Sequence, residues 1–150
     1  MGELAILKSK EIKEIAKLLE EQFECKEKLD YAFLRDSEGD IFLINRDIEK
    51  VDFETIRINS LGLYFAEHRN DELRLSIEGS QMIGPKAKKN VFEISGDNVF
   101  RYMKGEEIEA KEEYSDFMII KNGNDFFGCS KIKNRRLLNF YPKSRRISQS

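Results

Sequence analysis

The side chains best suited to chemistry lie in the last 25 positions of the chain, where cationic and aromatic residues are interleaved. Asp125 is the last acidic residue, and Asn139, Phe140 and Tyr141 follow it within the basic segment 126–150. Guanidinium groups donate paired hydrogen bonds to phosphate oxygens, and aromatic rings stack on unpaired bases. Such a combination is typical of surfaces that bind single-stranded nucleic acid. The cations of this segment are Lys131, Lys133, Arg135, Arg136, Lys143, Arg145 and Arg146.

The charge of the chain is divided unequally between its two parts. Residues 1–125 contain 19 Lys and Arg against 28 Asp and Glu, so they carry a net charge of −9, whereas residues 126–150 carry +7. A local positive potential attracts a polyanion even where the pI of the whole protein is 5.6. Nucleic acid is therefore the first partner to consider. The competing interpretation is a solvated, frayed basic tail with no ligand.

Other kinds of chemistry find little support in the residue types. Cys25 and Cys129 are far apart with no Cys-x-x-Cys spacing, and the only histidine, His68, stands beside a predicted turn. We therefore expect free thiols, no metal site and no cofactor. The adjacent acids Glu106-Glu107 and Glu112-Glu113 diverge on any regular element, which argues against a catalytic pair of carboxylates. The sequence predicts a protein that is not an enzyme.

The composition predicts a folded cytoplasmic protein with no membrane partner. With 150 residues and 40% hydrophobic content, the chain can bury one core or two small ones that share an interface. No apolar run approaches the ~20 residues that span a bilayer. Residues 1–10 also lack the basic region and long apolar run of a secretory signal.

The first part of the chain reads as a helix resting on a hairpin. Apolar residues recur every three or four positions from Ser9, which is a plausible N-cap, to Phe23. The runs Tyr31–Leu34 and Ile41–Ile44, separated by the turn residues 36–40, predict two antiparallel strands. Together these elements predict a small α+β unit over residues 1–54.

Shorter strand-like runs follow, beginning with Thr55–Ile58 and 62–67. Asn70-Asp71 separates two such runs at 63–65 and 73–75, and Gly123-Asn124 separates 117–120 from 126–127, so each pair predicts a hairpin.

Two brief helices interrupt the strands. The first is Ser76–Ile83, capped by Ser76 and ended by Gly84-Pro85, and the second is Asp97–Met103, closed by Gly105. The pattern predicts a mostly antiparallel barrel with short helices over residues 55–150, with a domain boundary near 52–58.

Four stretches of the C-terminal part resemble a known family, in the same order and at matching spacing. The most specific is the last, in which Asn, an aromatic pair, Pro-Lys and Arg follow one another. The stretches are Leu61-Gly62-Leu63-Tyr64-Phe65-Ala66-Glu67, Tyr102-Met103-Lys104-Gly105-Glu106, Phe127-Gly128-Cys129-Ser130-Lys131 and Asn139-Phe140-Tyr141-Pro142-Lys143-Ser144-Arg145-Arg146. Over residues 56–147 the chain resembles the PUA-like RNA-binding domain of Sun-family RNA 5-methylcytosine methyltransferases.

The chain differs from the usual family pattern at two places, and residues 1–54 have a resemblance of their own. The chain has Leu75-Ser76-Ile77 where the family often has Pro-Ser-His, and Ala66 where a second glycine is common. Residues 1–54 are similar in layout to the small pre-PUA modules that precede PUA barrels in several archaeal RNA-binding proteins. The resemblance therefore implies a pre-PUA-like unit followed by a PUA-like β-barrel.

The resemblance implies RNA binding without methyl transfer, by an accessory domain standing alone. The catalytic domain of the family needs one cysteine after proline and another after threonine, whereas Cys25 follows Glu24 and Cys129 follows Gly128. No Gly-x-Gly-x-x-Gly element for a methyl donor is present either. We expect a non-catalytic protein acting in rRNA or tRNA modification or in ribosome assembly.

Two alternatives stay open. In the first, the protein is a protein-interaction accessory subunit of an RNA-modifying or RNA-processing enzyme, and its partner is a separately encoded methyltransferase or a processing complex. In the second, the barrel acts on RNA itself, although no nucleophile–base pair is visible in the sequence.

In PUA-like domains RNA usually lies between the first short helix, with its following loop, and the last strand. The resemblance thus brings the loop 84–90 to the same surface as the basic end, although a lysine-rich loop is often only a solvated turn. One of Phe140 and Tyr141 is expected to point inward, because side chains alternate along a strand. The predicted RNA-binding residues are Gly79, Lys86, Lys88, Lys89, Lys131, Lys133, Arg135, Arg136, Asn139, Tyr141, Lys143, Arg145 and Arg146.

Overall fold

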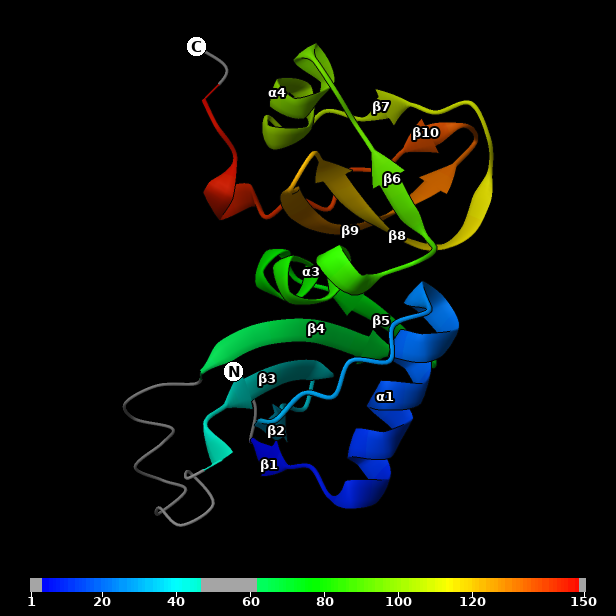
Figure 1. Cartoon of the computed structure of the whole chain (residues 1–150). Helices are drawn as coiled ribbons and strands as arrows, with labels where there is room; N and C mark the ends of the chain where they lie inside the picture. Colours follow the sequence, from blue (N-terminus) through cyan, green and yellow to red (C-terminus); the bar gives the residue numbers. More distant parts are fainter. Residues whose placement is uncertain (1–3, 47–61, 149–150) are drawn as a thin grey trace.

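The computed structural model describes residues 4–46 and 62–148, which form two five-stranded sheets with helix α3 between them (Figure 1). The first sheet has the order β1-β2-β3-β4-β5, with every neighbouring pair antiparallel. Its strands are β1 (Ala5–Ile6), β2 (Ala32–Arg35), β3 (Asp40–Ile44), β4 (Leu63–Arg69) and β5 (Glu72–Leu75). No helix within the described ranges is long and apolar enough to cross a membrane.

Helix α1 (Ser9–Phe23) covers one face of the first sheet, as the sequence pattern predicts. Its buried side chains include Ile15, Leu19 and Phe23. The predicted N-cap is wrong by one residue. Lys8 occupies the cap position with extended backbone angles (φ −92°, ψ 169°), and its N–H donates to Glu11 Oε1 at 3.2 Å, so Ser9 is already helical.

The predicted hairpins are confirmed, and one of them extends the first sheet. β4 and β5 join through Asn70 and Asp71, which both have positive φ (52° and 58°) as a tight hairpin turn requires. We expected this hairpin in the C-terminal unit, but β4 pairs with β3. The expected domain boundary near 52–58 and the strand Thr55–Ile58 lie outside the described residues.

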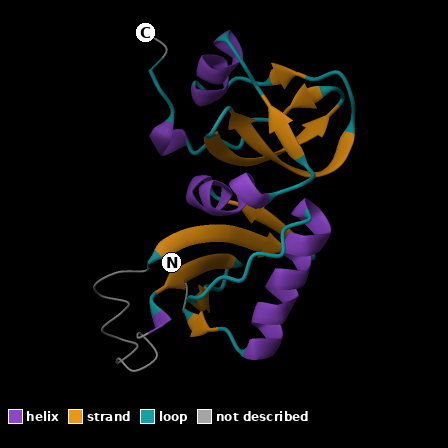
Figure 2. Cartoon of the chain, in the orientation of Figure 1, coloured by secondary structure: helices purple, strands orange, loops and turns teal. Residues whose placement is uncertain are grey.

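The second sheet curls into a half-barrel, so the α+β fold with a PUA-like barrel is confirmed. Its order is β6-β8-β9-β10-β7, with β6 and β8 parallel and the other pairs antiparallel. Helix α4 (Asp97–Met103) has the predicted bounds. Figure 2 shows the helices of the chain in purple and its strands in orange. The strands are β6 (Val91–Glu93), β7 (Ile108–Glu109), β8 (Tyr114–Asn122), β9 (Asp125–Lys133) and β10 (Arg136–Leu137).

Helix α3 (Ile77–Ile83) packs closely against both sheets because two glycines remove the side chains that would intervene. Ser76 is its N-cap, as predicted, and the Ser76 Oγ accepts a bond from the Gly79 N–H at 2.9 Å. A Cβ on Gly79 would lie 2.1 Å from the Phe65 carbonyl oxygen in β4, and one on Gly84 would meet the Phe126 ring in β9 at 2.3 Å.

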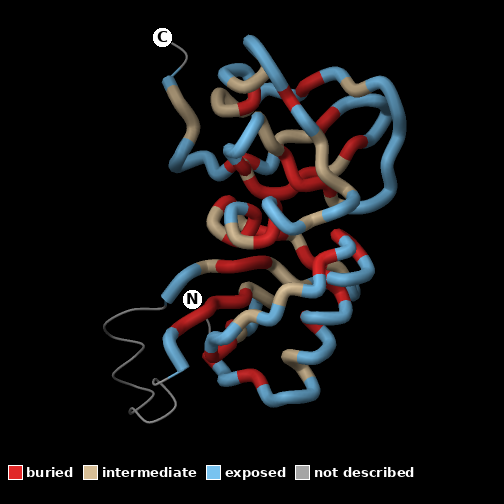
Figure 3. The backbone as a smooth tube through the Cα atoms, in the orientation of Figure 1, coloured by how far each residue is buried: buried red, intermediate tan, exposed pale blue. Residues whose placement is uncertain are grey.

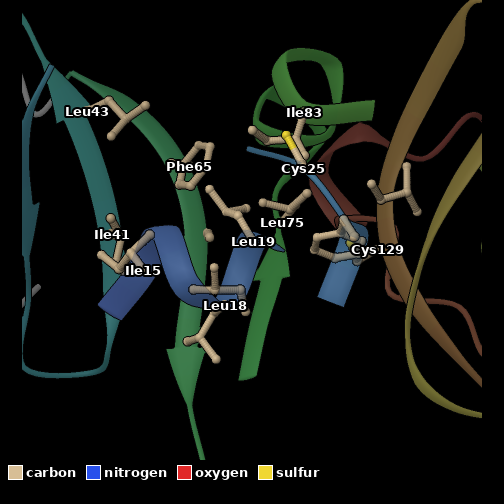
Figure 4. Close-up of a cluster of buried hydrophobic side chains, with 14 of the residues drawn as sticks. Ile15, Leu18, Leu19, Cys25, Ile41, Leu43, Phe65, Leu75, Ile83 and Cys129 are labelled. Atoms are coloured by element: carbon tan, nitrogen blue, oxygen red, sulfur yellow. The ribbon is translucent and has the colours of Figure 1, made fainter. Parts of the chain in front are cut away.

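The two sheets share one hydrophobic core, and a second cluster of buried residues forms the core of the half-barrel. Figure 3 shows buried residues along the centre of the chain. Side chains from α1, the first sheet, α3 and β9 meet in the shared core, among them Leu19, Phe65 and Ile83 (Figure 4). The free cysteines Cys25 and Cys129 are both buried in this core. The half-barrel and the helical first unit therefore support each other.

Candidate nucleic-acid interface

A pocket of about 280 Å³ opens where the start of α3 faces the C-terminal segment. We call it the α3 pocket. Aromatic rings, two arginines and one glutamate form its wall, and its floor reaches the shared core. Its lining residues are Tyr64, Arg74, Leu75, Ser76, Ile77, Glu78, Phe127, Gly128, Cys129, Phe140, Pro142 and Arg145.

Of Phe140 and Tyr141 one is buried and the other is not, as expected, although both follow β10 (Arg136–Leu137) and lie outside any strand. Tyr141 is only 7% exposed and packs edge-on against Tyr102 with ring centres 5.9 Å apart. Phe140 is 37% exposed and lines the α3 pocket. The Phe117 ring lies 6.4 Å from the Phe140 ring, and the Arg74 guanidinium carbon lies 5.3 Å from its centre. Phe140, rather than Tyr141, is the ring available for stacking on a base.

The charges around the α3 pocket are arranged as ion pairs. Arg145 Nη1 donates to Glu78 Oε2 at 2.6 Å, and Arg74 pairs with Glu67 at 3.5 Å. Each guanidinium group has five N–H donors, so both arginines keep donors for a ligand phosphate.

Two further groups in the wall of the α3 pocket stay neutral near pH 7. Burial raises the pKa of the Cys129 thiol to about 12. Burial, and next the charge of Asp40, raise the pKa of Tyr64 to about 12. The Tyr64 hydroxyl donates to Asp40 Oδ1 at 3.3 Å. A protonated thiol is a poor nucleophile, so Cys129 offers the pocket packing rather than reactivity.

The structure divides the predicted basic surface. Lys133, Arg135 and Arg136 lie at the turn between β9 and β10, four to six residues along β9 from the pocket residues 127–129, which is roughly 13–20 Å. Arg136 is paired with Glu107 at 3.1 Å. Of the predicted cations, only Arg145 lines the α3 pocket.

Other members of the basic end are also engaged. Lys131 pairs with Glu72 at 3.2 Å and places its Nζ 4.6 Å from the centre of the Phe117 ring. Arg146 Nε donates to the Tyr141 carbonyl at 3.2 Å. No ion pair of Lys133, Arg135 or Lys143 is found within residues 4–46 and 62–148.

The loop of residues 84–90, which we call the lysine loop, lines a second pocket of about 590 Å³ at the other end of α3. We call it the lysine pocket; Lys88 and Lys89 line it together with Lys121 from β8 and Asn124 from the β8–β9 turn. Lys86 instead pairs with Glu27 at 3.1 Å. The lysine loop and Arg145 therefore line two separate pockets at opposite ends of one helix, rather than one continuous site.

Three predicted binding residues have structural contacts. Gly79 is buried under Phe65, and Tyr141 belongs to the core of the half-barrel. The Asn139 amide donates to the carbonyls of Tyr102 and Glu106 at 2.8 and 2.7 Å. Asn139 and Tyr141 anchor the C-terminal segment that carries Phe140 and Arg145, whereas Gly79 lets α3 approach β4.

Several residues that line the pockets are not among the RNA-binding residues predicted from the sequence. Phe140 is one of them, although the sequence marks it as an aromatic residue within the basic segment. Arg74 and Tyr64 come from the first sheet, and Lys121 from the β8–β9 hairpin. No local pattern marks them, because they reach the pockets only through the stacking of the two sheets on α3.

Comparison with known proteins supports the family resemblance. Residues 89–147 match the family described as "Methyltransferase RsmF PUA domain". The match spans the second sheet, α4 and the C-terminal segment with Phe140 and Arg145. No curated protein matches the chain significantly. The chain thus contains a PUA-like domain that resembles the C-terminal domains of Sun-family methyltransferases.

Proposed function

We propose, from the premise that residues 89–147 form a PUA-like domain of RNA methyltransferase type, that this protein is a non-catalytic, cytoplasmic RNA-binding protein. PUA domains bind RNA, which supports RNA as the partner. The proposed process is the modification of rRNA or tRNA, or ribosome assembly. A methyltransferase encoded separately is the proposed protein partner.

The α3 pocket is the observation that carries this proposal. It combines an exposed aromatic ring, Phe140, with a guanidinium group, Arg74, at 5.3 Å from the ring centre. Unpaired bases stack on aromatic rings and on guanidinium planes, and this is how single-stranded RNA is most often recognised. Its volume of about 280 Å³ is close to the lower end of protein ligand sites, roughly 300 Å³, and suits one base rather than a base pair.

Cations on both sides of α3 can bind the phosphates that flank this base. Arg145 stands in the wall of the α3 pocket, and Lys88, Lys89 and Lys121 line the lysine pocket at the far end of the helix. Helix α3 has seven residues, so it is roughly 10 Å long, a span of about two nucleotides. In this arrangement Phe140 and Arg74 hold the base, and the lysines hold the backbone.

The test is a binding titration against a transfer RNA and against duplex DNA over a series of salt concentrations. If about four phosphates are bound, the log–log slope of the binding constant against salt will be roughly −3. Arg74→Gln/Arg145→Gln should lose most of the RNA affinity. Arg46→Gln/Arg101→Gln is the matched control, since it removes two arginines that also pair with carboxylates but lie outside the pocket and outside the predicted RNA-binding residues.

The outcomes separate RNA binding from protein docking. RNA preference with a steep slope that only the Arg74/Arg145 variant loses supports the proposal. Binding that is independent of salt, or equal for duplex DNA, contradicts it. In that case the accessory-subunit alternative is tested by co-purification. A separately encoded methyltransferase that co-purifies with the Arg74/Arg145 variant as well as with the wild-type protein would support it.

A further inference from the structure

Glu78 is the one acidic side chain among the residues that line the α3 pocket. It stands in the first turn of α3, where its side chain is 35% exposed. An acidic group in the wall of a pocket for a polyanion is unfavourable unless it is compensated. We therefore look for a function of Glu78 other than phosphate binding.

Arg145 supplies the compensation. Its Nη1 donates to Glu78 Oε2 at 2.6 Å, across 67 positions of sequence, so the α3 helix and the C-terminal segment meet at this contact. With Arg74 in the same wall, the lining keeps an excess of one positive charge. The carboxylate is also oriented by this bond, which leaves Oε1 with no partner that the structure describes.

An ionised carboxylate only accepts hydrogen bonds, so it discriminates among bases by their donors. Guanine presents an imino N–H and an amino group side by side on its Watson–Crick edge, and two acceptor lone pairs of a carboxylate can bind both. Adenine and cytosine present one amino group each. Uracil presents a single N–H between two carbonyl oxygens, which a carboxylate repels. Carboxylates accept from base amino groups in known nucleic-acid interfaces.

We propose that Glu78 determines base specificity in the α3 pocket, favouring an unpaired guanine and disfavouring uracil. Phe140 and Arg74 hold the plane of the base, and Glu78 reads its edge. Arg145 is a positioning residue that orients the carboxylate and reduces its repulsion of phosphates. This inference rests on the proposed RNA binding, and it adds to that proposal the class of base that is bound.

The test uses four short hairpin RNAs that differ only in one unpaired loop base, with affinity measured by fluorescence anisotropy. The wild-type protein should bind the guanine hairpin about tenfold more tightly than the uracil hairpin, as a bidentate contact provides. Glu78→Gln should reduce that ratio to about threefold or less. Its affinity for the uracil hairpin should not fall, because the amide can donate to a uracil carbonyl.

Glu107→Gln is the matched control, since it also removes the carboxylate of a Glu–Arg pair but lies outside the α3 pocket. It should keep the guanine preference. Glu78→Ala is a second variant, and thermal melting verifies that each variant is folded. Equal affinity of the wild-type protein for all four hairpins overturns the Glu78 inference and leaves the proposed function standing. Failure to bind any hairpin or transfer RNA overturns both.

Discussion

The guanidinium carbon of Arg74 lies 5.3 Å from the centre of the Phe140 ring. Arg74 belongs to β5 of the first sheet, and Phe140 to the C-terminal segment that follows the second sheet. The contact therefore joins the two halves of the molecule at the mouth of the α3 pocket. A base that stacks on Phe140 is placed beside the Arg74 guanidinium group, which completes the proposed base-binding wall.

Phe140→Ala should lower RNA affinity by about 5- to 100-fold, because stacking contributes about 1–3 kcal/mol per base. The stability of the fold should change little, since the ring is 37% exposed. Anisotropy titration measures the first effect and thermal denaturation the second. Phe100→Ala, which removes a 60% exposed ring from α4, is the matched control and should bind RNA normally. Equal affinities of the two variants would refute a stacking role for Phe140.

Tyr141→Ala, unlike Phe140→Ala, should lower the free energy of unfolding. Tyr141 is 7% exposed and contacts Tyr102 in the half-barrel core. Truncation of a buried aromatic ring costs about 3–5 kcal/mol in the free energy of unfolding. Urea denaturation measures this loss of free energy. Tyr141→Phe is the control: it keeps the ring and should lose much less free energy of unfolding. A loss below about 1 kcal/mol would be inconsistent with core packing.

Gly79→Ala should also destabilise the fold, although alanine is normally the better helix former. The new Cβ would lie 2.1 Å from the Phe65 carbonyl oxygen, so α3 must move away from β4. We expect a loss of about 1–3 kcal/mol in the free energy of unfolding, as for other overpacked sites. The control is Gln81→Ala, at an exposed position of the same helix. If Gly79→Ala is as stable as that control, the result contradicts the close packing of α3 against β4.

Lys88→Gln/Lys89→Gln should weaken RNA binding and also flatten its salt dependence. Two lost phosphate contacts reduce the magnitude of the log–log slope by about 1.4, at ~0.7 per contact for a single strand. Lys10→Gln/Lys13→Gln, on the exposed face of α1, is the control for a general loss of charge. An unchanged slope would mean that the lysine pocket binds no phosphate.

Alkaline pH should destabilise the protein through Cys129. Burial raises the pKa of its thiol from an ordinary value of 9.0 to about 12. Between these values the folded protein keeps a proton that the unfolded chain releases, so the free energy of unfolding falls as pH rises through this window. Urea denaturation at pH values from about 8 to about 10 measures this dependence.

Cys129→Ala is the control for the alkaline effect and should have a weaker pH dependence over the same range. A fall should remain above about pH 10, because burial also raises the pKa of Tyr64 and Tyr102 to about 12. A pH dependence identical to that of the wild-type protein would show that the thiol is not responsible.

The sequence by itself determined the local elements of this protein. The Ser76 cap, the bounds of α4 and the Asn70-Asp71 turn follow from signals within a few residues, and the structure confirms each of them. The family resemblance of the C-terminal part also follows from the sequence. The sequence predicts that one of Phe140 and Tyr141 is buried but not which one, and the structure buries Tyr141 in a segment that follows β10 rather than in a strand.

Only the tertiary structure decided which charges and rings share a site. The pairing of β4 with β3 carries Arg74 toward Phe140, and the stacking of both sheets on α3 brings Glu78 to Arg145. Such contacts join residues more than 60 positions apart, and burial of the common core, rather than any local pattern, selects them. The basic end is continuous in sequence, but β9 carries Lys133 and the β9–β10 turn roughly 13–20 Å away from the β9 residues that line the α3 pocket.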